Sequence, residues 1–98
     1  MSGLVALTTD LMDRSRLSAA LPEVRFVLDA DADVVIVDLA RGVAQVTSVR
    51  ASNPKARIVC YGPHVDDASL RDARAAGADV VLPRSRFFRD PKAAVAGI

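Results

Sequence analysis

Four short runs of β-branched and aliphatic residues constrain the fold of this chain more than any other feature. They lie at Leu4–Leu7, Val34–Val37, Arg57–Tyr61 and Asp79–Leu82. Most of their apolar residues stand at successive positions, which is the pattern of strands buried on both faces of a parallel sheet. We therefore expect strands covered by helices on both sides. Four residues should be almost inaccessible to water: Val35, Val37, Ile58 and Val59.

Stretches of helical period separate these runs. They cover Asp10–Leu21, Val43–Ala51 and Asp66–Ala76, and Asp90-Pro91 opens a last short helix. Thr9 or Asp10 is placed to cap the first helix, and Gly77 to end the third. The first helix sets one group of residues, Leu11, Leu17, Ala20 and Leu21, against another, Asp13, Arg14, Arg16 and Ser18. The alternation of strands and helices predicts an α/β three-layer sandwich, and the length predicts one domain over residues 1–98.

One further segment, Val24–Leu28, has the composition of a strand but lacks the connection that a full parallel strand needs. Only residues 29–32 separate it from the run that opens at Asp33. Neighbouring parallel strands need a crossover of a dozen or more residues. We therefore expect a truncated edge segment here, followed by no helix.

Composition excludes several classes of protein. Thirteen basic and twelve acidic residues give a net charge of +1, which lacks the broad positive field of a non-specific nucleic-acid binder. No apolar run approaches the roughly 20 residues that span a bilayer, and no export signal is recognisable. The single cysteine, Cys60, fits a reducing compartment. We expect a cytoplasmic protein that binds neither nucleic acid nor a membrane.

Three motifs carry a resemblance to a known family. DVVIVDL ends on a strand with Asp38, RIVCYGPH resembles the next strand and its loop, and AAGADVVLPR resembles a Gly-Ala-Asp turn followed by a strand. Together they resemble the receiver domain of bacterial response regulators, a flavodoxin-like fold with strand order 2-1-3-4-5. The resemblance implies that order with the second strand truncated and the second helix missing. It also places Asp38 where receivers carry their phosphoacceptor aspartate.

At the family's other functional positions this chain departs from the pattern. Thr8 and Thr9 stand where receivers have the acidic pair that binds a divalent metal, with Asp10 one position further. Gly62 replaces the hydroxyl residue that contacts the phosphoryl group, and Arg84 replaces the lysine. Hydroxyls are poor ligands for Mg²⁺, and Arg is not equivalent to Lys. We therefore expect a pseudo-receiver, which is not an enzyme and holds no metal or cofactor.

Structural roles compete with functional ones at several of these residues. Asp38 is also suited to cap a turn or to pair with Arg84. The acidic alternation at 29–33 lacks the glycine and glutamate of a calcium loop, so a solvated turn is expected. His64 has no nucleophile nearby in sequence, and Cys60 suits a small core residue.

The segment 84–89 combines two adjacent aromatic residues with three arginines. Adjacent residues of a regular element do not both point inward, so at least one aromatic ring should be exposed, unless both pack under the short C-terminal tail. Aromatic and Arg side chains are enriched in interface cores. The candidate interface residues are Arg84, Arg86, Phe87, Phe88 and Arg89, with Val24 and Phe26 at the bare sheet edge.

The expected function is that of a stand-alone, non-catalytic pseudo-receiver that regulates through protein–protein contact. The missing helix and the bare edge should expose apolar surface, and two-fold pairing is the commonest way to cover it, so a homodimer is expected. One alternative is a true response regulator that accepts phosphate on Asp38 from a histidine kinase. A third is a small-ligand-binding module at the strand ends near Asp38, Gly62 and Arg84.

Overall fold

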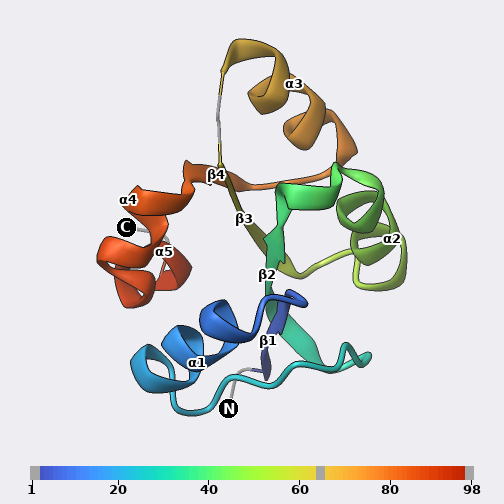
Figure 1. Cartoon of the computed structure of the whole chain (residues 1–98). Coiled ribbons are helices and arrows are strands. Elements are labelled where there is room, and N and C mark those ends of the chain that lie inside the picture. The colour runs from blue at the N-terminus through green and yellow to red at the C-terminus, as the bar shows by residue number, and fades with distance from the viewer. Residues whose placement is uncertain (1–2, 64–65, 97–98) are drawn as a thin grey trace.

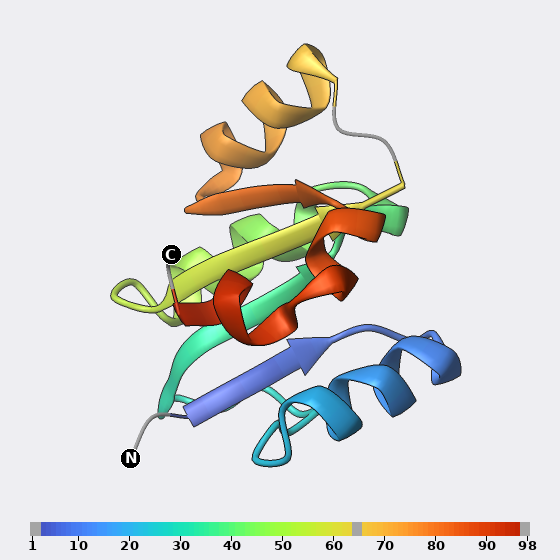
Figure 2. The same ribbon diagram turned by 90° about the vertical axis from the view of Figure 1, so that its left-hand side faces the viewer.

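The computed structural model describes residues 3–63 and 66–96 and contains one parallel sheet. Its strands are β1 (Gly3–Leu7), β2 (Ala32–Asp38), β3 (Arg57–Gly62) and β4 (Val80–Pro83). Each strand pairs in parallel with its successor, in the order β1-β2-β3-β4. The carboxyl ends of all four strands therefore share one edge of the sheet, as the arrowheads in Figure 2 show. The four predicted runs are confirmed as strands.

Helices cover both faces of this sheet. The predicted helices are α1 (Leu11–Ala20), α2 (Ala44–Ser52), α3 (Asp67–Ala76) and α5 (Pro91–Ala96). Two short helices were not expected, η1 (Leu39–Arg41) and α4 (Arg84–Arg89). Figure 1 shows α1, α4 and α5 on one face of the sheet and α2 and α3 on the other, which is a three-layer arrangement. No helix among the described residues has the length and apolar character to cross a bilayer.

The two central strands form the core. Val35, Val37, Ile58 and Val59 are all 0% exposed, as expected from their uninterrupted apolar runs. Successive strand residues point to opposite faces. Ile58 thus packs in the cluster under α2 and α3, while Val59 packs in the cluster under α1, α4 and α5.

The segment at Val24–Leu28 forms no strand. Arg25 alone makes an isolated parallel bridge with Val5, its N–H donating to the Leu4 carbonyl at 2.9 Å and its carbonyl accepting from Ala6 N–H at 2.8 Å. The predicted strand order 2-1-3-4-5 is therefore wrong for this sheet, which has four strands in sequential order. Since Val5 also pairs with β2, Arg25 lies on the outer side of β1. The chain then has too few residues to extend the pairing before β2 begins.

Local signals explain where the helices begin and end. The Asp10 carboxylate caps α1 by accepting from Asp13 N–H at 3.0 Å. Gly77 ends α3 with φ +121°, a conformation that L side chains rarely adopt. A Cβ on Gly77 would lie 2.9 Å from the Arg50 side chain, which donates to the Gly77 carbonyl and to Asp79. Arg50 thereby ties α2 to the turn before β4.

Candidate functional site

Asp38 lies half-buried at the carboxyl end of β2. One carboxylate oxygen accepts a hydrogen bond from the Thr8 hydroxyl at 3.1 Å, and the other accepts from Ala40 N–H at 2.9 Å. Asp38 therefore caps η1, which is one of the structural roles considered for it. Among the described side chains no cation forms a salt bridge with it.

The residues at the metal-ligand positions are already engaged within the fold. Thr8 is buried, and its hydroxyl accepts from Asp10 N–H at 3.2 Å while it donates to Asp38. Thr9 is exposed, and the Asp10 carboxylate caps α1. Within residues 3–63 and 66–96, no three His, Cys, Asp or Glu side chains gather as a metal site would require.

Arg84 pairs with Asp13, a residue that sequence analysis did not place in the site. The guanidinium donates to both carboxylate oxygens of Asp13, and the Tyr61 hydroxyl donates to one of them at 2.8 Å. The Asp13 side chain is 0% exposed, whereas that of Arg84 is 37% exposed. The considered pairing of Arg84 with Asp38 is therefore wrong.

This cluster shifts the protonation equilibria of its members. The bond from Arg84, followed by that from Tyr61, holds the pKa of Asp13 below its ordinary value of 3.8, against the opposing effect of burial. The bond to Asp13 raises the pKa of Arg84, and burial raises the pKa of Tyr61. At neutral pH the cluster is thus an ion pair supported by a neutral phenol.

The rotation of α1 explains why the carboxylate is inside. Leu17 is buried, and it stands four residues after Asp13 but six after Leu11. Because an α-helix has 3.6 residues per turn, Asp13 and not Leu11 shares the inward face with Leu17. The grouping of Leu11 with Leu17 is therefore wrong, and Leu11 and Met12 are 77% and 67% exposed. The four-residue spacing between Asp13 and Leu17 is visible in the sequence, but acidic residues are so rarely buried that this spacing alone does not predict an inward-facing Asp13.

The two adjacent aromatic residues of α4 both pack around Tyr61. Phe87 stacks on the Tyr61 ring with centroids 4.9 Å apart, and Phe88 meets it edge-on at 5.0 Å. Phe87 is 0% exposed, so its assignment to an interface is wrong; Phe88 is half-buried. The Tyr61 ring thus contacts both phenylalanines, of which Phe87 alone is fully buried. Arg84 lies over the Phe88 ring at 4.9 Å.

The remaining interface candidates divide between core and surface. Val24 and Phe26 are half-buried and pack against the cluster under α1, α4 and α5, whereas Arg86 and Arg89 are exposed. The Arg14 guanidinium lies over the Phe26 ring, with its Cζ 5.2 Å from the ring centroid.

The other residues singled out by sequence make no hydrogen bond with Asp13 or Arg84, or lie outside the described residues. Gly62 is buried at the end of β3, beside Pro83, and His64 lies outside the described residues. Asp29 pairs with Arg25 in the connection before β2, as a turn residue would. Cys60 is buried in β3, and burial raises the pKa of its thiol to about 12, so it is an inert core residue.

Comparison with solved structures relates this arrangement to known proteins. A response regulator from Burkholderia pseudomallei with a phosphorylated aspartic acid superposes with a TM-score of 0.80 at 18% identity, over 97% of this chain and 66% of that one. A response regulator from Thermotoga maritima gives 0.72 at 14% identity, over 98% and 99%. The fold is that of a receiver domain. A putative pilus assembly-related protein from B. pseudomallei shares it, with a TM-score of 0.77 at 16% identity over 98% and 90% of the two chains.

Structural superposition shows the receiver fold, whereas comparison of the whole sequence does not. No protein-family model and no curated protein matches the sequence. The chain spans just under two thirds of the first of these response regulators. The likeness therefore concerns the arrangement of helices and strands, and activity depends on the residues of the site.

Proposed function

We propose that this chain is a degenerate receiver that transfers no phosphate and acts in signalling through protein–protein contact. The pairing of Arg84 with Asp13 is the observation that carries the proposal. A phosphoryl group on Asp38 would need the cation in the lysine position, here Arg84, to hold its oxygens. The Arg84 guanidinium instead donates two hydrogen bonds to the carboxylate of Asp13, whose side chain is fully buried.

The donor set at the strand ends does not fit a divalent cation. Mg²⁺ favours carboxylate ligands, and aspartyl phosphorylation depends on such an ion to neutralise the transferred charge. Thr8 and Thr9 supply only neutral hydroxyls, and the Asp10 carboxylate is engaged as the cap of α1. Among the described residues, Asp38 belongs to no group of three or more His, Cys, Asp or Glu side chains that could hold a metal ion.

Exposure to acetyl phosphate or beryllofluoride with Mg²⁺ should leave the protein unmodified and its thermal unfolding temperature unchanged. Intact-mass spectrometry measures the first outcome and circular dichroism the second. A phosphorylatable response regulator treated in parallel shows that the reagents are active. A phosphoryl adduct that disappears in Asp38→Asn would overturn the proposal in favour of a phosphoacceptor served by a histidine kinase.

The first turn of α1 is the surface that best fits a protein partner. Because Asp13 faces inward, the neighbouring Leu11 and Met12 side chains are exposed. They border a hollow of about 480 Å³, whose other lining residues are Ser15, Arg16 and Ala19. Exposed apolar side chains gathered at one place, with a polar rim, are typical of interaction sites. We name Leu11 and Met12 the α1 patch.

Wild-type protein should sediment as a dimer of the 10.4 kDa chain at tens of micromolar, because a two-fold copy lets one apolar patch cover its own counterpart. The Leu11→Ser, Met12→Ser double variant should sediment as a monomer. Val27→Ser is the matched control, since Val27 is 77% exposed in the connection after α1 and lies outside the patch. A single monomeric boundary for the wild type would contradict self-association, and a monomer only in Val27→Ser would move the contact away from α1.

A further inference from the structure

A hollow of about 380 Å³ opens beside Asp38, on the side where the connection between α1 and β2 contains no helix. Its lining comes from the ends of β1 and β2, from α1, from the connection and from the start of α2. The residues that matter to its chemistry are Leu7, Thr8, Arg14, Phe26, Asp38 and Gln45. We call it the β1–β2 hollow. Its size lies within the range of small-molecule pockets.

The β1–β2 hollow holds one anion and one cation that do not pair with each other. The Asp38 carboxylate accepts two hydrogen bonds, from Thr8 and from Ala40, although a carboxylate has about four acceptor positions. The Arg14 guanidinium uses only its Nε, which donates to the Thr8 carbonyl at 2.9 Å. Neither charged group makes a salt bridge within the described part of the chain, so the N–H groups on the terminal nitrogens of Arg14 are free to donate.

Both charges are held in place before any ligand arrives. Thr8 is buried and binds the two groups at once, Arg14 through its carbonyl and Asp38 through its hydroxyl. The Phe26 ring supports the flat face of the Arg14 guanidinium at 5.2 Å. Fixed side chains lose little conformational entropy on binding, which favours affinity for a small ligand.

Charge selects the class of ligand. A simple anion would be attracted by Arg14 but repelled by Asp38, and a simple cation would meet the reverse. A small molecule that carries both charges satisfies both groups: its carboxylate matches the guanidinium fork, and its ammonium group finds the Asp38 oxygens. Leu7 and Phe26 add apolar surface that suits a short side chain.

We propose that the β1–β2 hollow binds a small zwitterion of the free amino acid class, with Arg14 holding its carboxylate and Asp38 its ammonium group. The lining of this site does not include Arg84 or Gly62. It goes beyond a protein-contact role and gives the domain a means to respond to a metabolite. Binding needs no phosphoryl chemistry, so it stands or falls separately from the phosphorylation experiment.

Thermal unfolding in the presence of each standard free amino acid tests the proposal on the intact chain. At least one should raise the unfolding temperature further with each increase in its concentration, since a ligand that binds only the native state stabilises it by an amount that grows with the logarithm of its concentration. The N-acetyl and carboxamide derivatives of that amino acid, which each lack one charge, should produce no shift. Calorimetric titration of the same compounds measures the affinity.

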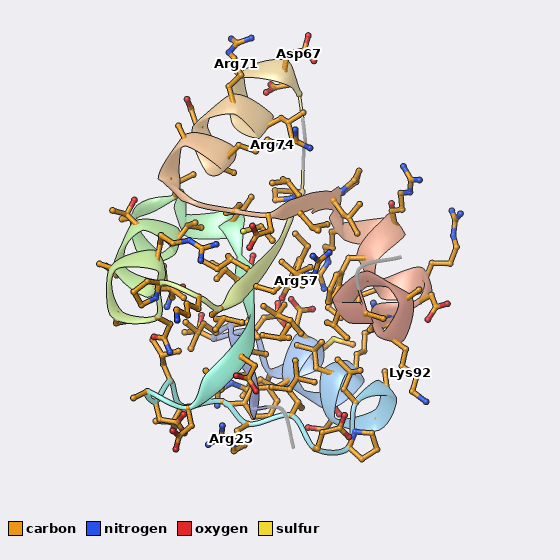
Figure 3. All side chains as sticks on the ribbon, turned by 180° about the vertical axis from the view of Figure 1, so that it is seen from behind. Arg25, Arg57, Asp67, Arg71, Arg74 and Lys92 are labelled. Carbon is orange, nitrogen blue, oxygen red and sulfur yellow. The ribbon has the colours of Figure 1, made fainter. Side chains whose placement is uncertain are left out.

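Variants then assign the two charges. Asp38→Asn and Arg14→Gln should each weaken the calorimetric affinity at least tenfold. The amide oxygen that Asp38→Asn introduces can still accept a hydrogen bond from the Thr8 hydroxyl, so the fold should persist. Asp72→Asn and Arg71→Gln are matched controls on exposed positions of α3. Figure 3 shows Arg71 at the opposite end of the molecule from Arg25, which is the chain neighbour of the lining residue Phe26. The proposal is overturned if no amino acid shifts the transition, if a single-charge derivative binds equally well, or if the Asp38 and Arg14 variants match the controls.

Discussion

Replacing Ile58 by alanine should lower the free energy of unfolding by about 2–5 kcal/mol. Ile58 is 0% exposed in β3, which pairs with β2 on one side and β4 on the other. It packs in the cluster under α2 and α3. Because hydrogen-bonded strands flank it on both sides, the backbone cannot collapse into the space that the lost carbons leave.

Chemical denaturation followed by circular dichroism measures this loss. Native domains are stable by about 5–15 kcal/mol, so the variant would lose a large share of the total. Val27→Ala provides the control, since a truncation at a position that is 77% exposed should change the free energy by no more than about 0.5 kcal/mol. A loss below about 1 kcal/mol in Ile58→Ala would show that β3 is not the central strand described here.

Replacing Asp13 by alanine should destabilise the fold by about 3 kcal/mol, the lower end of the cost of breaking a buried ion pair from one side. The variant leaves the Arg84 guanidinium and the Tyr61 hydroxyl without their shared acceptor. The cost is held to the lower end because the Arg84 side chain is 37% exposed and water can solvate part of its charge. Denaturation of Asp72→Asn, an exposed carboxylate of α3, serves as the control and should match the wild type.

The effect of Asp13→Ala on the free energy of unfolding should depend on pH. The pKa of Asp13 is lower in the folded state than its ordinary value of 3.8, so the folded state holds this proton more weakly than the unfolded state. Its stabilising effect is complete above about pH 4 and is lost as the pH falls through the folded-state pKa. The difference in stability between wild type and Asp13→Ala should therefore shrink below about pH 4. A difference that stays constant down to about pH 2 would mean that the pKa of Asp13 is the same in the folded and unfolded states.

The succession of strands and helices could be predicted from local patterns in the chain. A strand covered on both faces needs apolar residues at successive positions, and the runs at Val34–Val37 and Arg57–Tyr61 have them. The sequence also predicted a cap at Thr9 or Asp10, of which Asp10 is the one observed, and a helix stop at Gly77. Each of these depends on backbone geometry within a few residues. The resemblance to receivers likewise rested on contiguous motifs, and Asp38 does lie at a strand end.

The chemistry of the site depends on contacts between residues far apart in the sequence, which local patterns do not predict. Arg84 and Asp13 are 71 residues apart, and their contact depends on how α1 is rotated against the sheet. That rotation follows from packing of Leu17, and it buries a carboxylate while it exposes Leu11 and Met12. A local pattern ranks side chains by polarity. It holds no information about which distant cation lies within reach to offset the cost of burying a charge.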